Sequence, residues 1–267
     1  MKLLVMGAGY VGEALLRYLQ IQKHKIFITT TRKERVNALS YYGHSVLLPI
    51  EDKEFKELID SCDGVIILIA PKNLQSYKEV YLQTAKRVSL VLKDRQTPFY
   101  LLYTSSTSVC EGQQNKWVTE DRVLCPKSEN AKILLEAERS YLNCNASTCI
   151  LRLGGIYGPK RELLDRVKHF SGKKMLSSGE EFTNHIHLED IIAAIRFCLD
   201  HSLTGIYHLV NDDHTPRREL YSHLCQLAGI PSPIWSKDSS KSSYKVCNQK
   251  IKSMGFIFKH PRFKQMI

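Results

Sequence analysis

The sequence lacks any hydrophobic run long enough to cross a membrane as a helix. Such a helix needs about 20 consecutive apolar residues, whereas the longest apolar run, residues 65–70, has only the length of a buried strand. Because a strand pattern begins almost at Met1, no room is left for a leader peptide ahead of the fold. We therefore expect no membrane association and a cytoplasmic location.

Closely spaced cysteine pairs are also absent. The eight cysteines include no Cys-x-x-Cys pair, and several lie in apolar stretches such as residues 147–153 and 195–200. This scatter indicates reduced, buried thiols and argues against a disulfide framework or a zinc site.

Acidic residues are few compared with basic ones. The chain has 38 Lys and Arg against 27 Asp and Glu, a net charge of +11, and residues 237–267 contain eight basic residues and one acidic residue. Such a segment either meets an anionic ligand or a polyanion, or forms an ordinary solvated face. No recognition helix, aromatic stacking platform or nucleic-acid motif accompanies it, so a nucleic-acid function is the least favoured one.

The first half of the sequence alternates strand-like and helix-like runs. Strands are expected at residues 2–6, 25–30, 45–49, 64–70, 98–103 and 147–152. Helices are expected at residues 10–22, 33–42, 51–60, 74–94 and 129–143. This alternation predicts βαβ units, and hence an α/β fold of the Rossmann type with a doubly wound parallel sheet.

The sequence changes character after Gly154, where shorter elements are separated by Gly and Pro. We therefore expect a dinucleotide-binding domain over residues 1–153, to which about 183–212 contributes. The remainder, residues 154–267, is expected to form a smaller, partly inserted substrate-binding region.

A glycine motif directly follows the first expected strand and opens the first expected helix. In this motif, Gly7 permits a tight turn, Gly9 lets the backbone approach a pyrophosphate, and Gly12 lets the helix pack closely on the strand. Tyr10 and Val11 begin the helix, whose free N–H groups would face the phosphates. The motif therefore predicts a dinucleotide site; the alternative is a purely structural glycine turn.

The end of the second expected strand indicates which dinucleotide binds. An NAD site carries Asp or Glu about 20 residues beyond the glycines, to accept hydrogen bonds from the ribose hydroxyls. Here Thr31 is followed by Arg32, and Arg35 comes one helical turn later. Both arginines can form charge-assisted bonds to a 2′-phosphate, or they are solvated charges that open a helix. We expect NADP(H) in preference to NAD(H).

Two later strand ends contain further candidates. Ala70 and Pro71 end the fourth expected strand. A small residue and a residue without an N–H suit a backbone segment that passes close to the cofactor. The alternative is that these two residues simply terminate the strand. Residues 104–108, "TSSTS", follow the fifth. Hydroxyl groups there lie where a nicotinamide ring and a substrate would meet; the alternative is a turn that satisfies its own backbone.

An ordered set of motifs resembles the extended short-chain dehydrogenase/reductase superfamily, which contains NAD(P)-dependent sugar-nucleotide epimerases and dehydratases. The motifs are "GAGYVG", "YTSSTSVCEG", "WVTEDRVLCP", "LRLGGIYGPKR", "NHIHLEDIIAAI" and "GIYHLVNDD". The resemblance covers nearly the whole chain. It implies the Rossmann fold, a nicotinamide cofactor and a small-molecule substrate.

The resemblance also implies roles for three residues. In the family a Ser or Thr polarises the substrate, a Tyr acts as general acid and base, and a Lys four residues later holds the nicotinamide ribose. Ser106 matches the first and Lys132 the last, but Ser128, in "SENAK", stands where the Tyr is expected. An aliphatic hydroxyl is a far weaker acid than a phenol, so the chain resembles the atypical members that lack this Tyr.

Other candidate residues lie near the expected cleft. Arg152, Tyr157 and Arg161 are expected to bind substrate, and the arginines would suit an anionic one or else be ion-pair partners. Tyr157 and Tyr103 could also supply a phenol, although a packed core role is favoured for both. The family's inter-domain motif falls at His187 and Asp190, so we expect no metal at His185-x-His187.

These observations leave two hypotheses of different classes. The leading one is an NADP-dependent oxidoreductase or epimerase/dehydratase that acts on a sugar-nucleotide-like or carbonyl substrate with a degenerate Tyr-Lys pair. The alternative is a catalytically impaired, NADP-binding regulatory protein. Family members often form dimers through two helices of the Rossmann half, so a homodimer is expected as one option.

Overall fold

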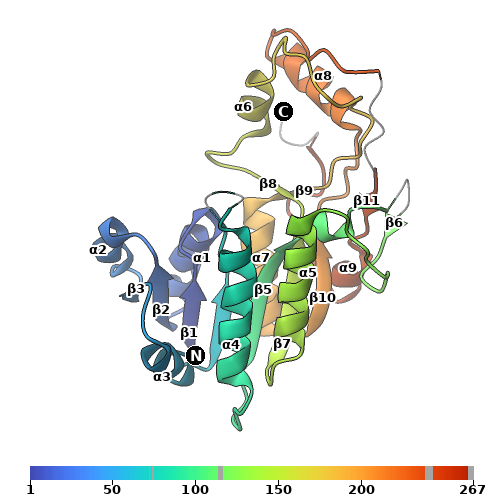
Figure 1. Cartoon of the computed structure of the whole chain (residues 1–267). Coiled ribbons are helices and arrows are strands. Elements are labelled where there is room, and N and C mark those ends of the chain that lie inside the picture. The colour runs from blue at the N-terminus through green and yellow to red at the C-terminus, as the bar shows by residue number, and fades with distance from the viewer. Residues whose placement is uncertain (72, 74, 114–116, 238–242, 264–267) are drawn as a thin grey trace. The chain divides into compact units, whose positions relative to one another are not determined.

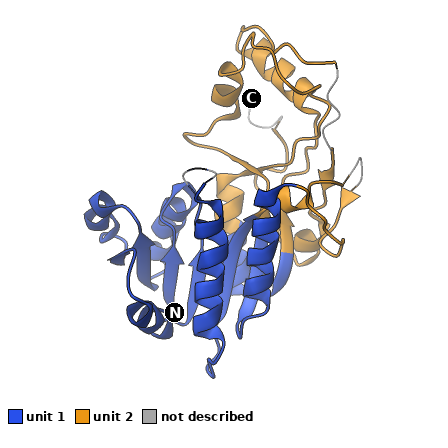
Figure 2. Cartoon of the chain, viewed as in Figure 1, with its two compact units in different colours: residues 1–105, 128–151, 194–206 blue, residues 106–127, 152–193, 207–267 orange. Residues whose placement is uncertain are grey.

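The chain folds into two compact units in the computed structural model, which describes residues 1–267 except 72, 74, 114–116, 238–242 and 264–267. Unit 1 comprises residues 1–105, 128–151 and 194–206, and unit 2 comprises residues 106–127, 152–193 and 207–267 (Figure 2). The chain passes between the units several times. We predicted that residues 1–153, with a contribution from about 183–212, bind the cofactor and that residues 154–267 bind the substrate. This division stays a prediction about function.

A seven-stranded sheet forms the centre of the fold. Its strand order is β10-β7-β5-β4-β1-β2-β3. The bounds are β1 Lys2–Met6, β2 Lys25–Thr30, β3 His44–Leu47, β4 Gly64–Ile67, β5 Tyr100–Ser106, β7 Ser147–Leu153 and β10 Gly205–Leu209. Neighbours from β3 through β2, β1 and β4 to β5 run parallel. The chain adds strands to one side of β1 and then to the other, so the order reverses next to β1, as in doubly wound sheets.

Both faces of the central strand β1 are buried. Leu4 and Met6 contribute to a core with residues of three helices, while Leu3 and Val5 point to the opposite face and are equally buried. Strands covered on both sides need no alternation of polar and apolar residues. The predicted α/β fold of the Rossmann type is therefore confirmed.

The helices of unit 1 follow the predicted ranges closely. They are α1 Tyr10–Ile21, α2 Val36–Leu39 after a short 3-10 turn at Lys33–Arg35, α3 Asp52–Asp60, α4 Thr84–Leu92 and α5 Glu129–Leu142. A π-helical segment, Lys78–Gln83, precedes α4, and the start of the predicted helix 74–94 lies outside the described residues. Figure 1 shows α4 and α5 side by side along one face of the sheet, where they pack on each other.

Unit 2 is built from shorter elements. They are a 3-10 turn at Thr107–Cys110, β6 Trp117–Val118, β8 Gly155–Tyr157, α6 Leu163–Lys168, β9 His185–His187, α8 Arg217–Leu227, β11 Lys245–Val246 and α9 Gln249–Ser253. Two small parallel pairs, β8 with β9 and β6 with β11, order its loops. Helix α7, Leu188–Asp200, begins in unit 2 and ends in unit 1.

None of the helices in the described part of the chain is long and apolar enough to serve as a membrane span.

Candidate dinucleotide site and active-site residues

The glycine motif lies in the loop from β1 to α1, next to the point where the strand order reverses. Gly7 has a φ of +98°, and a Cβ there would lie 2.8 Å from the backbone carbonyl of Leu68 just beyond β4. A Cβ at Gly12 would lie 2.1 Å from the carbonyl oxygen of Gly7. These two glycines are required by the fold itself, because backbone occupies the space of any side chain.

Gly9 differs from its two neighbours in the motif. It is the N-cap of α1 with an ordinary φ of −82°, and it provides no side-chain cap. A Cβ at this position would meet no atom of the described residues within 4 Å. Neither the backbone conformation nor packing against these residues therefore requires glycine here. A ligand that approaches the uncapped helix end would require it, and a dinucleotide pyrophosphate fits that description.

Arg35 packs against the glycine loop. Its Nη1 donates a hydrogen bond to the carbonyl oxygen of Ala8, and its Nη2 lies 3.0 Å from Glu13 Oε2. Glu13 also pairs with Arg17 at 2.8 Å. The cluster therefore carries two guanidinium groups for one carboxylate. Arg32 is exposed, and its backbone N–H donates to Thr30 Oγ1.

Glu13 was not identified as a site residue from the sequence. Its position in the first turn of α1 and its spacing of four from Arg17 could have indicated a role at the loop. Its pairing with Arg35, 22 residues away, is a tertiary contact that no local pattern indicates.

The end of β4 is shorter than predicted. The strand stops at Ile67, so Ala70 and Pro71 lie in the connection beyond it, with Ala70 exposed. The backbone N–H of Leu68 still donates to the Met6 carbonyl at 2.8 Å, which holds the start of this connection beside the glycine loop.

The hydroxyl-rich segment after residue 103 is partly strand and partly turn. Thr104 Oγ1 donates to the Ile67 carbonyl at 3.2 Å. Ser106 ends β5, and its Oγ accepts a hydrogen bond from the Ser108 N–H at 3.2 Å. Because Ser106 acts as acceptor in this contact, its own hydroxyl proton can still be donated to a substrate oxygen.

Ser128 caps helix α5. Its Oγ accepts a hydrogen bond from the Ala131 N–H at 3.3 Å, which satisfies one of the free donors of the first helical turn. The serine in SENAK therefore has a local structural role at the position where the family resemblance predicts a Tyr. Lys132 follows one turn later; its side chain is 55% exposed, and its Nζ lies 3.8 Å from Glu129 Oε2.

Neither of the two tyrosines considered as substitute acids is suited to that role. Tyr103 is fully buried in unit 1, with its ring centroid 4.7 Å from that of Tyr141. Burial raises its pKa well above the ordinary value. Burial likewise raises the pKa of Tyr157, which is 1% exposed in the core of unit 2. Both phenols therefore hold their protons more tightly than a free tyrosine.

The two arginines predicted to bind substrate lie in different surroundings within unit 2. Arg152 is buried, and its Nη1 lies 3.3 Å from His208 Nε2. Burial, together with the charge of Arg152, lowers the pKa of His208 to about 3. The backbone N–H of His208 donates to Glu120 at 2.8 Å.

Arg161 is exposed, and it lies in a turn that is closed by a hydrogen bond from its backbone N–H to the Gly158 carbonyl. Substrate binding stays a prediction for both arginines, and of the two only Arg161 is on the surface.

His187 and Asp190 hold the C-terminal segment of unit 2. Asp190 accepts hydrogen bonds from the backbone N–H groups of Lys259 and His260, at 2.7 and 3.1 Å. His187 Nδ1 accepts from the Glu189 N–H at 3.2 Å. Glu189 in turn pairs with both the ammonium of Lys259 and His260 Nε2.

The same cluster brings potential metal ligands together. Ligand atoms of His187, Glu189 and His260 all lie within 4.8 Å of one another. The ammonium group of Lys259 already pairs with the Glu189 carboxylate, and the lone pair of His187 Nδ1 already accepts the Glu189 N–H. An ion-pair cluster accounts for these contacts, and the prediction of no metal stays a prediction.

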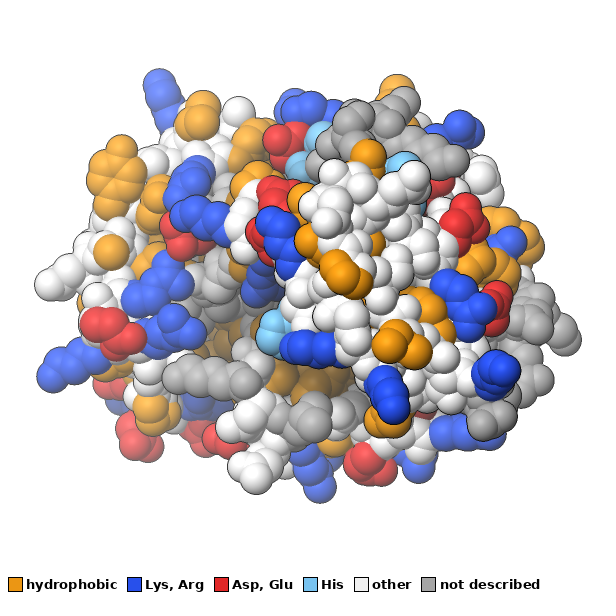
Figure 3. Space-filling view, turned by 90° about the horizontal axis from the view of Figure 1, so that it is seen from above, with side chains coloured by type: hydrophobic (Ala, Val, Ile, Leu, Met, Phe, Trp, Pro, Cys, Tyr) orange, Lys and Arg blue, Asp and Glu red, His pale blue; other side chains and the backbone are white. Residues whose placement is uncertain are grey.

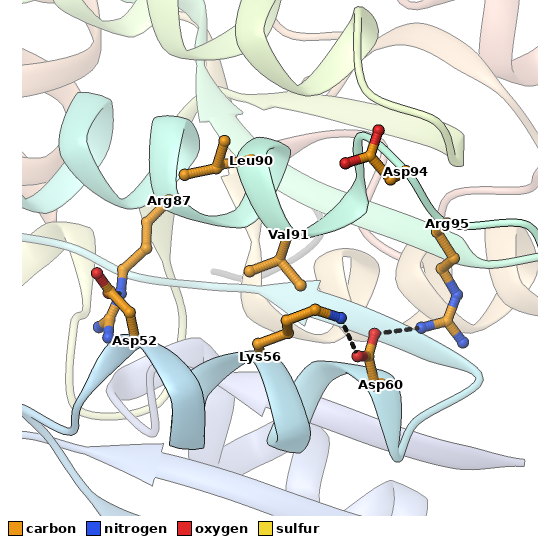
Figure 4. A pocket seen from close by; sticks show the side chains of 8 residues that line it. All are labelled: Asp52, Lys56, Asp60, Arg87, Leu90, Val91, Asp94 and Arg95. Atoms are coloured by element: carbon orange, nitrogen blue, oxygen red, sulfur yellow. Dashed lines mark hydrogen bonds and ion pairs between the residues drawn. The ribbon is translucent and has the colours of Figure 1, made fainter.

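A pocket of about 240 Å³ in unit 1 lies away from the predicted site residues. It is lined by Asp52, Lys56, Asp60, Arg87, Leu90, Val91, Asp94 and Arg95 of α3, α4 and the following turn (Figure 4). Arg87 pairs with Asp52 at 2.8 Å, and both Lys56 and Arg95 point toward Asp60. These pairs neutralise most of the charge that a ligand would contact there.

Basic side chains do not form one continuous patch on the face shown in Figure 3, where Asp and Glu side chains lie between them. The excess of positive charge therefore gives no single polyanion surface on this face.

Comparisons with known proteins agree with this fold. The model of the NAD dependent epimerase/dehydratase family matches residues 3–211. Protein YeeZ of Escherichia coli strain K12 is 28% identical over 274 residues, which cover 97% of this chain and 96% of that protein.

Two solved structures share the fold. The dTDP-glucose 4,6-dehydratase of Bacillus anthracis, solved with NAD, superposes with a TM-score of 0.80 at 16% identity and covers 97% of this chain and 92% of its own. MoeE5, solved with UDP-glucuronic acid and NAD, has a TM-score of 0.76 at 18% identity, with coverages of 96% and 93%. At such identities these structures support the fold alone. The family match over most of the chain, together with the glycine loop at the reversal of the strand order, shows that the chain belongs to the NAD-dependent epimerase/dehydratase family.

Proposed function

We propose that this protein is an NADP(H)-dependent oxidoreductase, or an epimerase/dehydratase that uses the same hydride chemistry, and that it acts in the cytoplasm on a small carbonyl or sugar-nucleotide-like substrate. The observation that carries the proposal is Gly9, whose lack of a side chain is explained by no contact within the chain. An external group at the uncapped end of α1 accounts for it.

The preference for NADP(H) over NAD(H) rests on the charges beside the glycine loop. Arg35 and Arg17 share one carboxylate, Glu13, and Arg32 is exposed nearby in the sequence. This excess of positive charge would stabilise a 2′-phosphate, and the carboxylate of the cluster, Glu13, is already paired with two guanidinium groups. The two structural neighbours were solved with NAD, so the cofactor preference that we propose differs from the cofactor named for them.

The proposed chemistry assigns separate roles to a few residues. A bound nicotinamide supplies or accepts a hydride at a substrate carbon, and a proton joins or leaves the adjoining oxygen. Ser106 would polarise that oxygen by donating its hydroxyl proton in a hydrogen bond. Lys132 would hold the nicotinamide ribose. Because Ser128 is a helix cap and the two tyrosines are buried, solvent water would carry the proton.

Cofactor binding is tested first by thermal shift. NADPH and NADP should raise the melting temperature more than NADH and NAD, and Arg35→Ala should reduce this difference. Arg218→Ala, at an exposed ion pair with Glu180 in unit 2, is the matched control. Stabilisation by NAD alone would overturn the preference, and stabilisation by no dinucleotide would overturn the site.

Catalysis is tested by NADPH oxidation with a panel of carbonyl compounds and nucleotide sugars. Ser106→Ala should lower turnover about a hundredfold or more, as expected for a group that stabilises the developing charge. Ser108→Ala, which changes another hydroxyl of the same turn, is the control. Firm NADPH binding without turnover of any compound would reject the enzymatic function.

That last outcome would favour a regulatory protein whose NADP occupancy controls a partner. The cap role of Ser128 supports this second candidate, because it accounts for the loss of the expected Tyr without any replacement acid. Under it, NADP should change the affinity of the chain for a partner, and Ser106→Ala should leave that change intact.

We also propose a homodimer through the α4 and α5 layer. Leu90 of α4 is 72% exposed although the helix packs on α5, so an apolar side chain is available for a second copy. Sedimentation of the wild type should give a dimer, and Leu90→Lys should shift it to a monomer. A wild-type monomer at high concentration would exclude this arrangement.

A further inference from the structure

Unit 2 contains an apolar cavity of about 470 Å³, lined mainly by two helices. Leu163 and Leu164 come from α6, and Leu220, Leu224 and Leu227 come from α8. Its volume falls in the range of sites that enclose a small organic molecule. The cavity lies outside the glycine loop and the residues assigned above to hydride chemistry, apart from Tyr157.

The walls of the cavity are fixed by the core of unit 2. Tyr157 and Phe263 complete the lining, and their ring centroids lie 5.4 Å apart. Leu220 and Leu224 are buried in the same core. The backbone N–H of Phe263 donates to Asp213 at 2.6 Å, which holds this wall in place. A ligand would therefore meet a preformed apolar surface and pay little ordering entropy.

Among the described residues that line the cavity, the charged ones are two exposed carboxylates, Glu162 and Asp165. Asp165 pairs with Lys168 at 3.1 Å, and the exposed Arg161 and Arg166 adjoin the two carboxylates in the sequence. The charge around the cavity is therefore mixed, and its apolar lining decides which ligand fits.

We infer that this cavity binds the apolar body of a neutral or cationic small molecule. Five leucines and two aromatic rings provide the binding surface, and burial of a small apolar ligand against them would supply most of the affinity.

Isothermal titration calorimetry with 2-tetralone, a bicyclic ketone, and with UDP-glucose tests the site directly. The wild type should bind 2-tetralone and not UDP-glucose. Leu164→Trp fills the cavity from its partly exposed wall and should weaken 2-tetralone binding about tenfold or more. Leu176→Trp is the matched control, because Leu176 is 91% exposed in the same unit and does not line the cavity.

A second pair of variants tests the charge around the cavity. Glu162→Lys should weaken binding of the cation 2-aminotetralin about tenfold relative to 2-tetralone. Glu219→Lys, at an exposed position of α8 outside the lining, should leave the ratio unchanged. A chain that ends at Phe263 shows whether the last four residues compete for the cavity.

Several results would overturn the inference. The first is that the wild type does not bind 2-tetralone, and the second is that wild type and Leu164→Trp bind it equally. The third is binding of UDP-glucose that Leu164→Trp abolishes. The fourth is 2-tetralone binding that appears only in the chain ending at Phe263. The proposed function is measured separately by NADPH oxidation. If 2-tetralone binding depends on Leu164 but NADPH is never oxidised, the site stands and the enzymatic function fails. If nucleotide sugars are turned over equally by wild type and Leu164→Trp, the proposed function stands, and the calorimetry with 2-tetralone alone decides the cavity.

Discussion

Helices α1 and α5 begin in opposite ways, although both lie in unit 1 and both start at a motif that the family resemblance links to the cofactor. Helix α1 starts at Gly9, which provides no side-chain cap and has open space beside it. Helix α5 starts at Ser128, whose Oγ satisfies the Ala131 N–H. The fold itself satisfies one N–H group at the start of α5, whereas Gly9 offers no such cap to α1, where we propose that a ligand binds. A family motif can therefore keep its place in the fold while its first residue takes a structural role as a helix cap.

The largest effect is expected where the glycine loop serves the fold. Gly12→Ala places a methyl group 2.1 Å from the Gly7 carbonyl oxygen, and this overpacking should cost about 3 kcal/mol of unfolding free energy or more. Chemical denaturation in urea without cofactor measures it. A loss below about 1 kcal/mol would mean that α1 shifts freely against β1.

Gly9→Ala should separate ligand binding from folding. The methyl group meets nothing in the protein, and alanine at an N-cap costs less than about 1 kcal/mol relative to glycine. The same methyl group should obstruct the pyrophosphate and weaken NADPH binding about thirtyfold or more, a loss of about 2 kcal/mol. Fluorescence titration with NADPH measures the affinity, and unaltered binding would mean that no phosphate approaches this helix end.

Lys132→Ala tests whether the last residue of SENAK still serves the cofactor. Its ion pair with Glu129, at 3.8 Å, is exposed, so the free energy of unfolding should change by less than about 0.5 kcal/mol. NADPH affinity should fall about tenfold, or about 1.4 kcal/mol. Lys86→Ala, from a comparably exposed pair with Glu136, is the control. Equal affinities of the two variants would remove Lys132 from the site.

Ser128→Ala should give the smallest effect and a purely structural one. Loss of the cap should lower the unfolding free energy by about 1 kcal/mol and leave NADPH affinity as in the wild type. Ser140→Ala, which changes an exposed hydroxyl of the same helix bonded to the Glu136 carbonyl, should have less effect on stability. A loss of turnover without any loss of stability would instead give Ser128 a catalytic role.

The alternation of strands and helices was predictable because each element is specified by its own residues. The expected strands 2–6 and 25–30 coincide with β1 and β2, and the expected helix 129–143 differs from α5 by one residue. The end of β4 was overestimated, because apolar residues continue past the last strand hydrogen bonds. Hydropathy indicates which residues are buried, but it does not indicate at which residue the hydrogen bonds between two strands end.

The site residues divide in the same manner. The glycines at positions 7, 9 and 12 follow from a local motif, but only their surroundings show that Gly7 and Gly12 serve the fold and that Gly9 faces open space. The sequence predicted substrate contacts for Arg152 and Tyr157, which stay predictions, and only the structure shows that both side chains are buried. The contact of Arg35 with the glycine loop and with Glu13 also joins segments that no sequence pattern connects.

The sequence by itself determined the Rossmann-type sheet, the place of the glycine loop and the departure from the family at SENAK, because each depends on residues close together in the chain. Only the tertiary structure decided that Ser128 caps a helix, that Tyr103 and Tyr157 are packed in cores, and that an apolar cavity lies in unit 2. The physical reason is that hydrogen-bond satisfaction, burial and cavity shape depend on segments far apart in sequence. Their chemistry appears only when the chain has folded.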